Sequence, residues 1–261
     1  SDVCSSDLNG SIGTAYAAGQ AGDGHFLLAT SNATLGANPA VYKKLAYDAE
    51  KDFTAIAPIG YMPAALVINK DLPATNFSEL IALMKKKERT WSFGSPGVGN
   101  PSHLAGERFK RRLGVEMEHV PYRGGNEIMR DLLGGQIQLA FSPLLESMPY
   151  VTSGRVRALA VTRSTRLPEL PDIPTMIESG VPGVEYTTWQ GVVAPAQIPR
   201  DIAITLNYEI RQILAEPETR EALAKIVIEP QPMTMEEFAA FMDAERRKWG
   251  EVARLVNVRI D

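Results

Sequence analysis

The sequence predicts an α/β fold, because short apolar segments typical of buried strands alternate with amphipathic segments typical of helices. Glycine or proline follows most of these segments, as is usual where strands and helices end. The 261 residues are 44% apolar and 22% charged, a balance that supports a packed core and excludes wholesale disorder. We expect two α/β lobes with largely parallel sheets.

Each predicted element has a local reason in the sequence. Strands are short apolar runs between turn residues, and helices place apolar side chains three and four residues apart. Two helices begin at capping boxes, Asn76-x-x-Glu79 and Thr234-x-x-Glu237. In chain order the predicted elements are helix 9–21, strand 25–30, polar loop 31–39, strands 55–59 and 64–69, a helix after Asn76, strand 90–94, a helix from Pro101 to Gly114, strand 115–120, helix 126–133, strand 137–141, helix 144–151, strands 156–162 and 187–194, and helices 200–214, 218–226 and from Met235 onward.

The last third of the chain is helical and lacks strands for a sheet of its own, so we expect it to pack on the first half. Two crossover strands, near 90–94 and 188–194, then connect the lobes. Lobe I comprises 9–91 and 192–261, and lobe II comprises 92–191. A double crossover of this kind permits hinge closure over a ligand.

Charge and residue types limit the partners that the chain can have. Lys and Arg number 27 against 31 Asp and Glu, a net charge of −4 without a basic run, which argues against nucleic acid or a membrane surface as partner. No apolar run approaches the ~20 residues that span a bilayer. The single cysteine, Cys4, cannot form an internal disulfide, and the three histidines lack metal-ligand spacing. We therefore expect no metal.

Residues 1–8, Ser-Asp-Val-Cys-Ser-Ser-Asp-Leu, differ from the rest of the chain. They contain no initiator Met, no basic region and no apolar stretch, so they are not a signal peptide. Their back-translation resembles a common sequencing-adapter oligonucleotide. We expect a non-native, adapter-derived segment here, and a natural polar tail is the alternative.

A glycine-rich loop lies between the strand predicted at 90–94 and the helix that follows it. Glycines allow backbone N–H groups to approach a ligand, and a helix N-terminus offers unpaired donors. Ser95, Gly97, Gly99 and Asn100 could therefore form an anion cradle. The loop is not a P-loop, since no Gly-Lys-Ser/Thr follows, and it lacks the third glycine of a dinucleotide fingerprint. A tight structural turn is an equal alternative.

Ser31, Asn32 and Thr34 follow the carboxyl end of a predicted strand, which is where open α/β sheets bind ligands. Their hydroxyl and amide groups could hydrogen-bond a carboxylate, and a plain solvated loop is the alternative. Ser142 has a similar place after the strand that ends at Phe141.

Other residues carry weaker signals. Tyr122-Arg-Gly-Gly125 could form a second backbone cradle, and Arg123 could pair with an anion, although a surface arginine is commoner. A structural or capping role explains His103 better than a catalytic one, because no second catalytic group accompanies it. Trp189 could line a cleft or pack in the core. No paired carboxylates and no nucleophile–base pair emerge, so the sequence favours binding over catalysis.

Seven segments carry a family resemblance that covers nearly the whole chain. They are N-P-A-V-Y-K-K-L-A-Y-D (38–48), S-P-G-V-G-N-P-S-H-L-A-G-E (95–107), H-V-P-Y-R-G-G (119–125), D-L-L-G-G-Q-I-Q (131–138), R-A-L-A-V-T (157–162), L-P-D-I-P-T (170–175) and W-Q-G-V-V-A-P (189–195). In this order the chain resembles the substrate-binding proteins of tripartite tricarboxylate transporters, also called the Bug family.

The resemblance implies a two-lobed periplasmic binding protein of the second type. Such a protein captures a small organic carboxylate by closing its lobes and passes it to the membrane components of the transporter. The resemblance also implies a monomer in the periplasm, with no enzyme activity and no cofactor. By position, the ligand contacts would fall on Ser31, Asn32 and Thr34 in lobe I, on Ser95, Gly97, Gly99 and Asn100 in lobe II, and on Ser142 and Trp189 lining the cleft.

The chain departs from the family pattern at two places. Asp or Asn is common in the family where Ser142 stands, so a ligand with an amine would lose a potential charge partner there. Family members also begin with a signal peptide and a strand–loop–helix unit before the segment that Asn9–Gly13 match. We therefore expect an absent βαβ unit, an incomplete lobe I, and better folding of lobe II than of lobe I.

Two alternatives stay open at this point. A sensor could use the same fold to present a carboxylate to a signalling kinase, and partner capture would separate it from a transport protein. An α/β enzyme could use His103 as a base, and loss of turnover in His103→Ala would support it.

Overall fold

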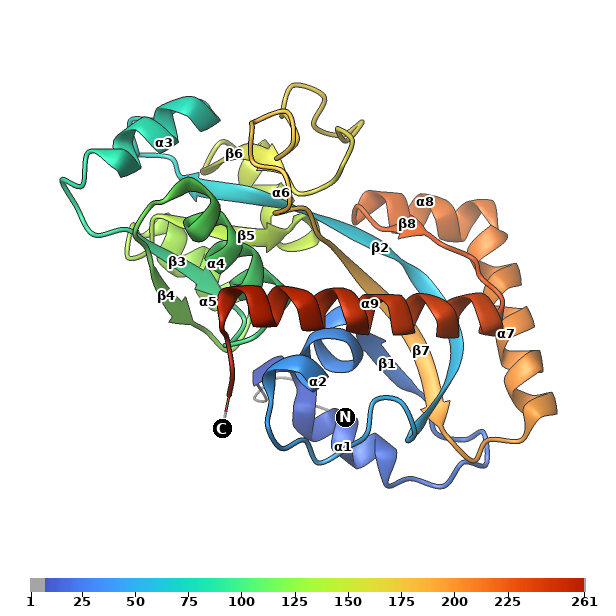
Figure 1. The fold of residues 1–261 in the computed structure, drawn as a ribbon. Helices are drawn as coiled ribbons and strands as arrows, with labels where there is room; N and C mark the ends of the chain where they lie inside the picture. The colour runs from blue at the N-terminus through green and yellow to red at the C-terminus, as the bar shows by residue number, and fades with distance from the viewer. Residues whose placement is uncertain (1–7, 261) are drawn as a thin grey trace. The chain divides into compact units, whose positions relative to one another are not determined.

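The computed structural model describes residues 8–260 and divides the chain into two compact units (Figure 1). Unit 1 contains the chain up to Met62 and again from Thr188, and unit 2 is the continuous segment Pro63–Thr187. The segment predicted to be adapter-derived falls, apart from Leu8, outside the described residues.

The chain passes from one unit to the other inside two strands, β2 (Phe53–Asn69) and β7 (Thr187–Pro195). The second crossing agrees with the strand predicted near 188–194. The first crossing lies in β2 and not near 90–94, so unit 2 begins at Pro63 where the sequence analysis began lobe II at residue 92.

β2 is one strand of 17 residues, and the prediction of two separate strands here is wrong. Its two halves have different partners: Gly60 and Tyr61 pair with β8 (Glu229–Pro230), whereas 64–69 pair with β5 and β6. Pro63, which has no N–H to donate, lies between the two paired stretches. The change of partner therefore occurs without a break in the strand.

Unit 1 has a small sheet. β1 (Leu28–Ser31) runs antiparallel to β7, with Ser31 opposite Gln190, and β7 lies next to β2. The helical elements of this unit are two short turns, Leu8–Gly10 and Asn32–Ala37, and the helices α1 (Ser11–Ala18), α2 (Asn38–Val41), α7 (Arg200–Ala215), α8 (Pro217–Lys225) and α9 (Met235–Val256).

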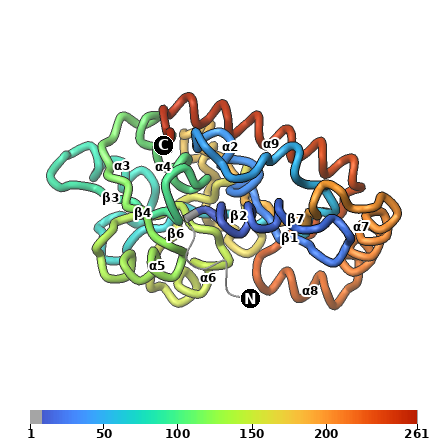
Figure 2. The backbone as a smooth tube through the Cα atoms, turned by 90° about the horizontal axis from the view of Figure 1, so that it is seen from below, coloured from blue at the N-terminus to red at the C-terminus, as the bar shows by residue number. Residues whose placement is uncertain are grey.

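α9 covers the core of unit 1. The predicted capping box is present, because Glu237 N donates to Thr234 Oγ1 (3.2 Å) and Thr234 N donates to the Glu237 carboxylate (2.8 Å). Phe238, Met242 and Trp249 are buried along one face of the helix. α9 lies beside α2 in both views (Figures 1 and 2) and packs on the turn Asn32–Ala37.

Ser31 is the last residue of β1 and residues 32–39 are helical, so the prediction of a polar loop for 31–39 is wrong. Ser31 ends β1 and caps the turn Asn32–Ala37, which continues directly into α2. Leu35 and Ala37 are fully buried against α9. Packing of these two apolar side chains outweighs the weak helix propensity of the polar residues around them.

Unit 2 is built on a mixed sheet. The second half of β2 runs antiparallel to β5 (Leu139–Pro143) and to β6 (Val156–Val161). β3 (Ser92–Ser95) runs parallel to β4 (Glu118–Pro121) and to β5. The prediction of largely parallel sheets is therefore wrong for the strands that flank β2, which enters this sheet from unit 1 and not through a helical crossover.

The helices of unit 2 follow its strands in turn: α3 (Phe77–Lys85), α4 (Pro101–Leu113), α5 (Gly125–Leu133) and α6 (Leu144–Thr152). The carboxyl ends of the parallel strands β3, β4 and β5 share one edge of the sheet, and α4, α5 and α6 begin just beyond them. Each helix start has unpaired backbone N–H groups and the positive end of a dipole. This edge of unit 2 is thus suited to an anion.

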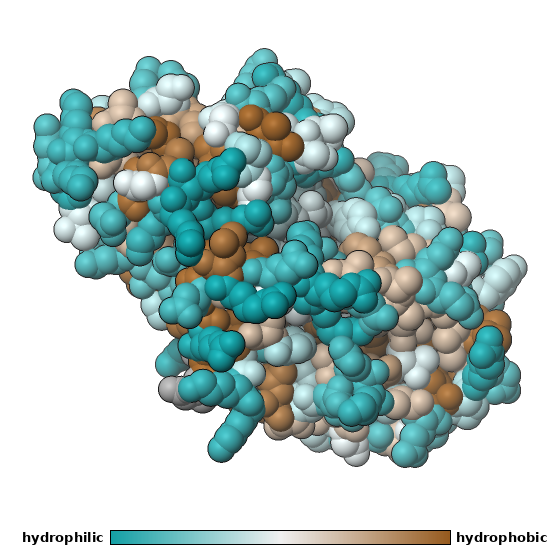
Figure 3. Space-filling view, viewed as in Figure 1, coloured by the Kyte–Doolittle hydropathy of each residue, from teal (hydrophilic) through white to brown (hydrophobic). Residues whose placement is uncertain are grey.

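The face seen in Figure 3 is dominated by hydrophilic side chains, with hydrophobic residues scattered among them. Among the described residues, none of the helices combines the length and the apolar character needed to cross a membrane. A metal-binding group of three or more His, Cys, Asp or Glu is likewise absent from residues 8–260.

Candidate functional site

The residues predicted in unit 1 lie together where β1 ends. Ser31 Oγ accepts a hydrogen bond from Ala33 N (3.3 Å), and Thr34 Oγ1 accepts from Ser31 N (3.3 Å) and donates to Ser31 O (3.2 Å). Thr34 Oγ1 also lies 2.7 Å from Thr30 Oγ1. These hydroxyls therefore already form a closed capping network, which stabilises the helical turn that follows.

The three predicted residues of this group differ in exposure. Asn32 is 1% exposed and Thr34 9% exposed, whereas Ser31 is only partly buried. Asn32 has an interaction within the protein, so it is not a free amide. Ser31 is thus the member of the group that a ligand can reach most directly.

The glycine-rich loop of unit 2 is held by its own polar groups. Ser95 is fully buried, and its Oγ donates to Gly97 O (2.9 Å) and accepts from Gly97 N (3.3 Å). Gly99 N donates to His103 Nδ1 (3.0 Å). Gly97 and Gly99 have φ of 135° and 77°, conformations that side-chain-bearing residues rarely adopt. The glycines are required by the turn, and their N–H groups point into the loop.

Two histidines, His103 and His119, contact the glycine-rich loop. The rings of His103 and His119 stack with centroids 3.8 Å apart, and Phe93 packs on both. His119 Nε2 lies 2.7 Å from Ser95 Oγ. Burial lowers the pKa of His103 to about 4, with a smaller contribution from Lys110, and lowers the pKa of His119 to about 3, with a smaller contribution from His103. Both rings are therefore neutral near pH 7, and the geometry gives His103 a structural role.

Asn100 caps α4, because its Oδ1 accepts from Ser102 N (3.0 Å). Ser102 Oγ lies 3.1 Å from the hydroxyl of Tyr186, which also donates to Phe141 O (3.2 Å). Tyr186 thereby links the start of α4 to the end of β5. Burial raises its pKa well above the ordinary value, and the Glu146 carboxylate adds to this shift.

Ser142 follows Phe141 in β5, opposite Ala65 of β2. It is 3% exposed, and its Oγ donates to Pro143 O (3.2 Å). Ser142 therefore lies at the sheet edge where the sequence predicted it.

Trp189 is part of the core of unit 1. It is 1% exposed, packs edge-on against Phe238 and Phe241, and donates from Nε1 to Glu245 Oε2 (3.3 Å). The structure thus favours core packing, the alternative that the sequence left open, over a cleft-lining position.

The second predicted backbone cradle, 122–125, leads into α5. Gly124 precedes the helix without a side-chain cap. Arg123 is exposed, and its N–H donates to Glu127 Oε2 (3.2 Å). Tyr122 donates to Asp131 Oδ2 (3.0 Å), and burial with this bond raises the pKa of Tyr122 to about 12. Within residues 8–260, the Arg123 guanidinium makes no ion pair.

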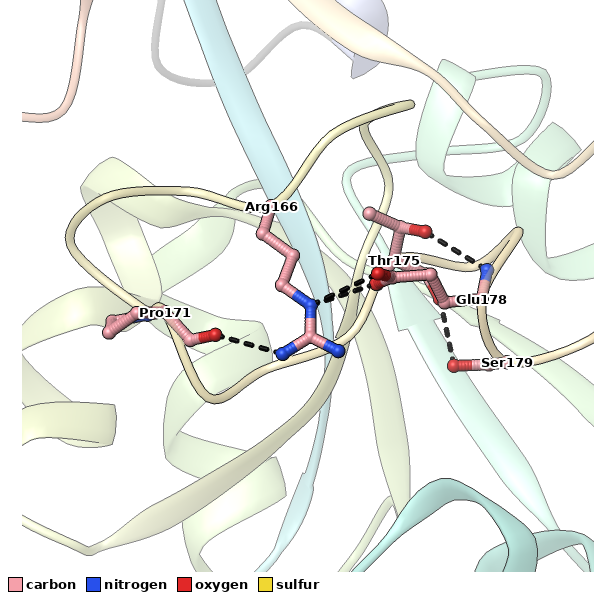
Figure 4. A network of polar contacts seen from close by, with 5 residues as sticks. All are labelled: Arg166, Pro171, Thr175, Glu178 and Ser179. Carbon is pink, nitrogen blue, oxygen red and sulfur yellow. Dashed lines mark hydrogen bonds and ion pairs between the residues drawn. The ribbon is translucent and has the colours of Figure 1, made fainter.

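A polar network fixes the proline-rich segment that leads to Tyr186 (Figure 4). Arg166 Nε donates to both carboxylate oxygens of Glu178 (3.2 and 3.0 Å), and its Nη1 donates to Pro171 O (3.0 Å). Thr175 N donates to Glu178 Oε2 (2.7 Å), and Ser179 Oγ donates to Thr175 O (2.8 Å). Bonds from the Thr175 backbone and from Arg166 lower the pKa of Glu178.

A cavity of about 310 Å³ lies elsewhere in unit 2, between the end of α3 and the chain leading into β4. Met84, Trp91, Val115 and Met117 are among its lining residues, with lysine, arginine and glutamate side chains around them. None of the predicted site residues lines it.

Sequence reasoning missed three residues at the edge of unit 2: His119, Tyr186 and Glu146. His119 and Tyr186 reach the loop from distant positions in the chain, so no local spacing could reveal them. Glu146 is an acidic residue in the first turn of a predicted helix. A solvated charge is common at that position, so nothing in the sequence singled it out. Its burial becomes visible only when α5 and α6 are placed.

Several solved structures share this fold. A structure described as R. palustris Rpa4515 with adipate has 32% sequence identity and a TM-score of 0.92, covering 97% of this chain and 85% of its own. The periplasmic binding protein BugD matches with 31% identity and a TM-score of 0.90 over 97% of this chain and 85% of its own. MatC from Rhodopseudomonas palustris with bound malate has 28% sequence identity and a TM-score of 0.86, covering 94% of this chain and 85% of its own.

A curated relative, the UPF0065 protein in the tcbD-tcbE intergenic region of Pseudomonas sp. strain P51, is 33% identical over 241 residues, which are 92% of this chain and 71% of the relative. The family model described as tripartite tricarboxylate transporter family receptor matches residues 6–258. The chain belongs to this receptor family, which confirms the resemblance carried by the seven segments.

Proposed function

We propose that this chain is a periplasmic receptor that binds a small organic carboxylate and delivers it to the membrane components of a tripartite tricarboxylate transporter. Membership of the receptor family supports this proposal, and so do the dicarboxylates, adipate and malate, that two similar structures contain. Binding without catalysis fits the site, since His103 and His119 are both neutral and engaged in structural contacts.

The observation that carries the proposal is the edge of unit 2 where α4, α5 and α6 begin. Three helix starts at the ends of parallel strands supply backbone N–H groups and positive dipole ends, which bind carboxylates without an arginine. Arg123 lies two residues before the start of α5, and its guanidinium makes no ion pair within residues 8–260. A hydrogen-bonded anion is therefore the ligand chemistry that this edge fits best.

We propose a role for each predicted residue, supported by its hydrogen bonds within its own unit. In unit 2, Asn100 and Ser142 contact a ligand, and Ser95, Gly97 and Gly99 hold the loop beside them. In unit 1, Ser31 contacts a ligand, and Asn32 and Thr34 hold the turn that it caps. Closure of two lobes on the ligand, a monomeric state and a location in the periplasm remain predictions.

A thermal melt against mono-, di- and tricarboxylates tests the function. A ligand at ~100 times its Kd adds about 2.7 kcal/mol to the stability of the native state, so a binding acid raises Tm clearly. Ser142→Ala is expected to reduce that shift. Ser153→Ala removes the same kind of hydroxyl-to-carbonyl bond at the far end of α6 and serves as the matched control. A sharp melt that no carboxylate moves would contradict the proposal.

A further inference from the structure

Glu146 lies in the first turn of α6 with its carboxylate against the start of α5. A Cβ atom placed on Gly125 would lie 2.0 Å from Glu146 Oε2 and 2.7 Å from Oε1. The carboxylate therefore packs directly on the first residue of α5, in a space that exists because residue 125 has no side chain. Gly125 is part of the motif 119–125, which sequence analysis singled out as a backbone cradle.

Among the described residues, the Glu146 carboxylate has no hydrogen-bond or ion-pair partner. A carboxylate that leaves water without a partner loses free energy, so such groups are usually paired. Burial accordingly raises the pKa of Glu146 to about 6, and no positive charge counteracts this effect. At pH 7.5 the group is still mainly ionised, and it retains unused hydrogen-bond acceptors.

The surroundings of Glu146 connect it to residues of the proposed carboxylate site. Its charge acts on Tyr186, whose hydroxyl contacts both Ser102 at the start of α4 and Phe141 beside Ser142. On its other side is α5, which begins without a side-chain cap. An acceptor-only group thus lies next to backbone donors that suit an anion.

We propose that Glu146 is a specificity-determining residue, whose carboxylate accepts a hydrogen bond from a hydroxyl or ammonium group of the bound carboxylate. The inference rests on the proposed function and names the ligand class: acids that carry a hydrogen-bond donor near a carboxylate. An ionised Glu146 repels an unsubstituted diacid and attracts a donor-bearing one. Ser142 has no charge to pair with an amine of the ligand. Glu146, in the first turn of the helix that follows Ser142, supplies that charge.

The test compares three four-carbon acids that differ at one position. Succinate has no donor, L-malate has a hydroxyl and L-aspartate has an ammonium group. Calorimetry at pH 7.5 measures Kd of each for the wild-type chain, for Glu146→Gln, and for Glu116→Gln as a control that removes an exposed carboxylate of the same unit. Adipate is included so that binding to a longer diacid is also detected.

We expect the wild type to bind malate or aspartate about tenfold or more tightly than succinate, and Glu146→Gln to reduce this ratio about fivefold or more. Glu116→Gln leaves the ratio unchanged. Equal ratios in the wild type and in Glu146→Gln, with measurable binding, would overturn the inference and leave the proposed function intact. If a cooperatively melting wild type binds none of the four acids, the proposed function itself fails.

Acidity gives a second readout. Between pH 7.5 and 5.5 the Glu146 carboxyl gains a proton, so succinate is expected to bind more tightly to the wild type but not to Glu146→Gln. Tyr186 stays protonated in this range, the facing part of α5 is the backbone of Gly125, and His103 and His119 stay neutral. A succinate affinity with the same pH dependence in both proteins would contradict the role of Glu146.

Discussion

The two groups of predicted ligand residues differ in how their polar atoms are satisfied. At the end of β1, the hydroxyls of Ser31, Thr34 and Thr30 bond one another and the adjacent backbone. In unit 2, the loop 95–100 is equally well bonded, but Glu146, packed on Gly125 at the start of α5, lacks a partner among the described residues. A closed network holds a backbone in place, whereas an open acceptor distinguishes one ligand from another.

The largest effect is expected in the core of unit 1. Trp189→Ala removes a fully buried indole that packs on Phe238 and Phe241, and it leaves Glu245 without one of its donors. A loss of roughly 3–5 kcal/mol in the free energy of unfolding follows from such a cavity. Amide exchange should show the loss in unit 1 while unit 2 keeps its protection. Equal loss in both units would show that they do not unfold separately.

Acid is expected to weaken unit 2 more than unit 1. The pKa values of His103 and His119 are lowered in the folded state, so their neutral forms favour folding above pH 6.5, and this stabilisation is lost as pH falls toward 4. For His119 alone this loss is on the order of 3 kcal/mol by pH 4, at about 1.4 kcal/mol per pKa unit. Urea unfolding between pH 7 and 4 measures it. In His119→Gln the slope should be shallower, and an unchanged slope would contradict this account.

Overpacking beneath the loop gives a smaller effect. A Cβ atom at position 106 would lie 2.1 Å from Phe93 Cε2, and Phe93 packs on both histidines. Gly106→Ala should cost about 1–3 kcal/mol and weaken carboxylate binding through the displaced loop. Gly250→Ala, on α9 with open space around it, is the matched control and should leave binding unchanged.

The smallest effect concerns the cap after β1. Thr34→Val keeps the shape of the side chain and removes the hydroxyl that bonds Ser31 and Thr30. A cost of about 1 kcal/mol is typical for such a cap. Chemical unfolding measures it, with Thr205→Val on the exposed face of α7 as control. If Thr34→Val lowered the free energy of unfolding more than Gly106→Ala does, the closed network would do more than hold the turn.

The sequence predicts elements well where the signal is local. The N-cap at Asn76, the capping box at Thr234 and the proline at the start of α4 place three helices correctly, because caps act within one turn. At Asn76 only half of the predicted capping box forms, since the Glu79 carboxylate accepts from Thr75 N instead. The turn Asn32–Ala37 and the continuous β2 were not predicted, because α9 and the sheet partners that stabilise them are distant in the chain. The site divides in the same way: Ser95, Asn100 and Ser142 follow strands in the sequence, whereas His119 and Glu146 matter only through tertiary contacts.

The order of the two units along the chain has a consequence for synthesis. Unit 2 is one uninterrupted segment, but unit 1 needs β7 and α9, which come last. At ~5–20 residues per second, the ribosome takes roughly 4–15 s to add residues 188–261 after unit 2 is complete. During that interval β1 lacks its antiparallel partner β7, and α9 does not yet cover Leu35. Unit 1 therefore stays incomplete until synthesis of residues 188–261 ends, whereas unit 2 has all of its residues once Thr187 has been added.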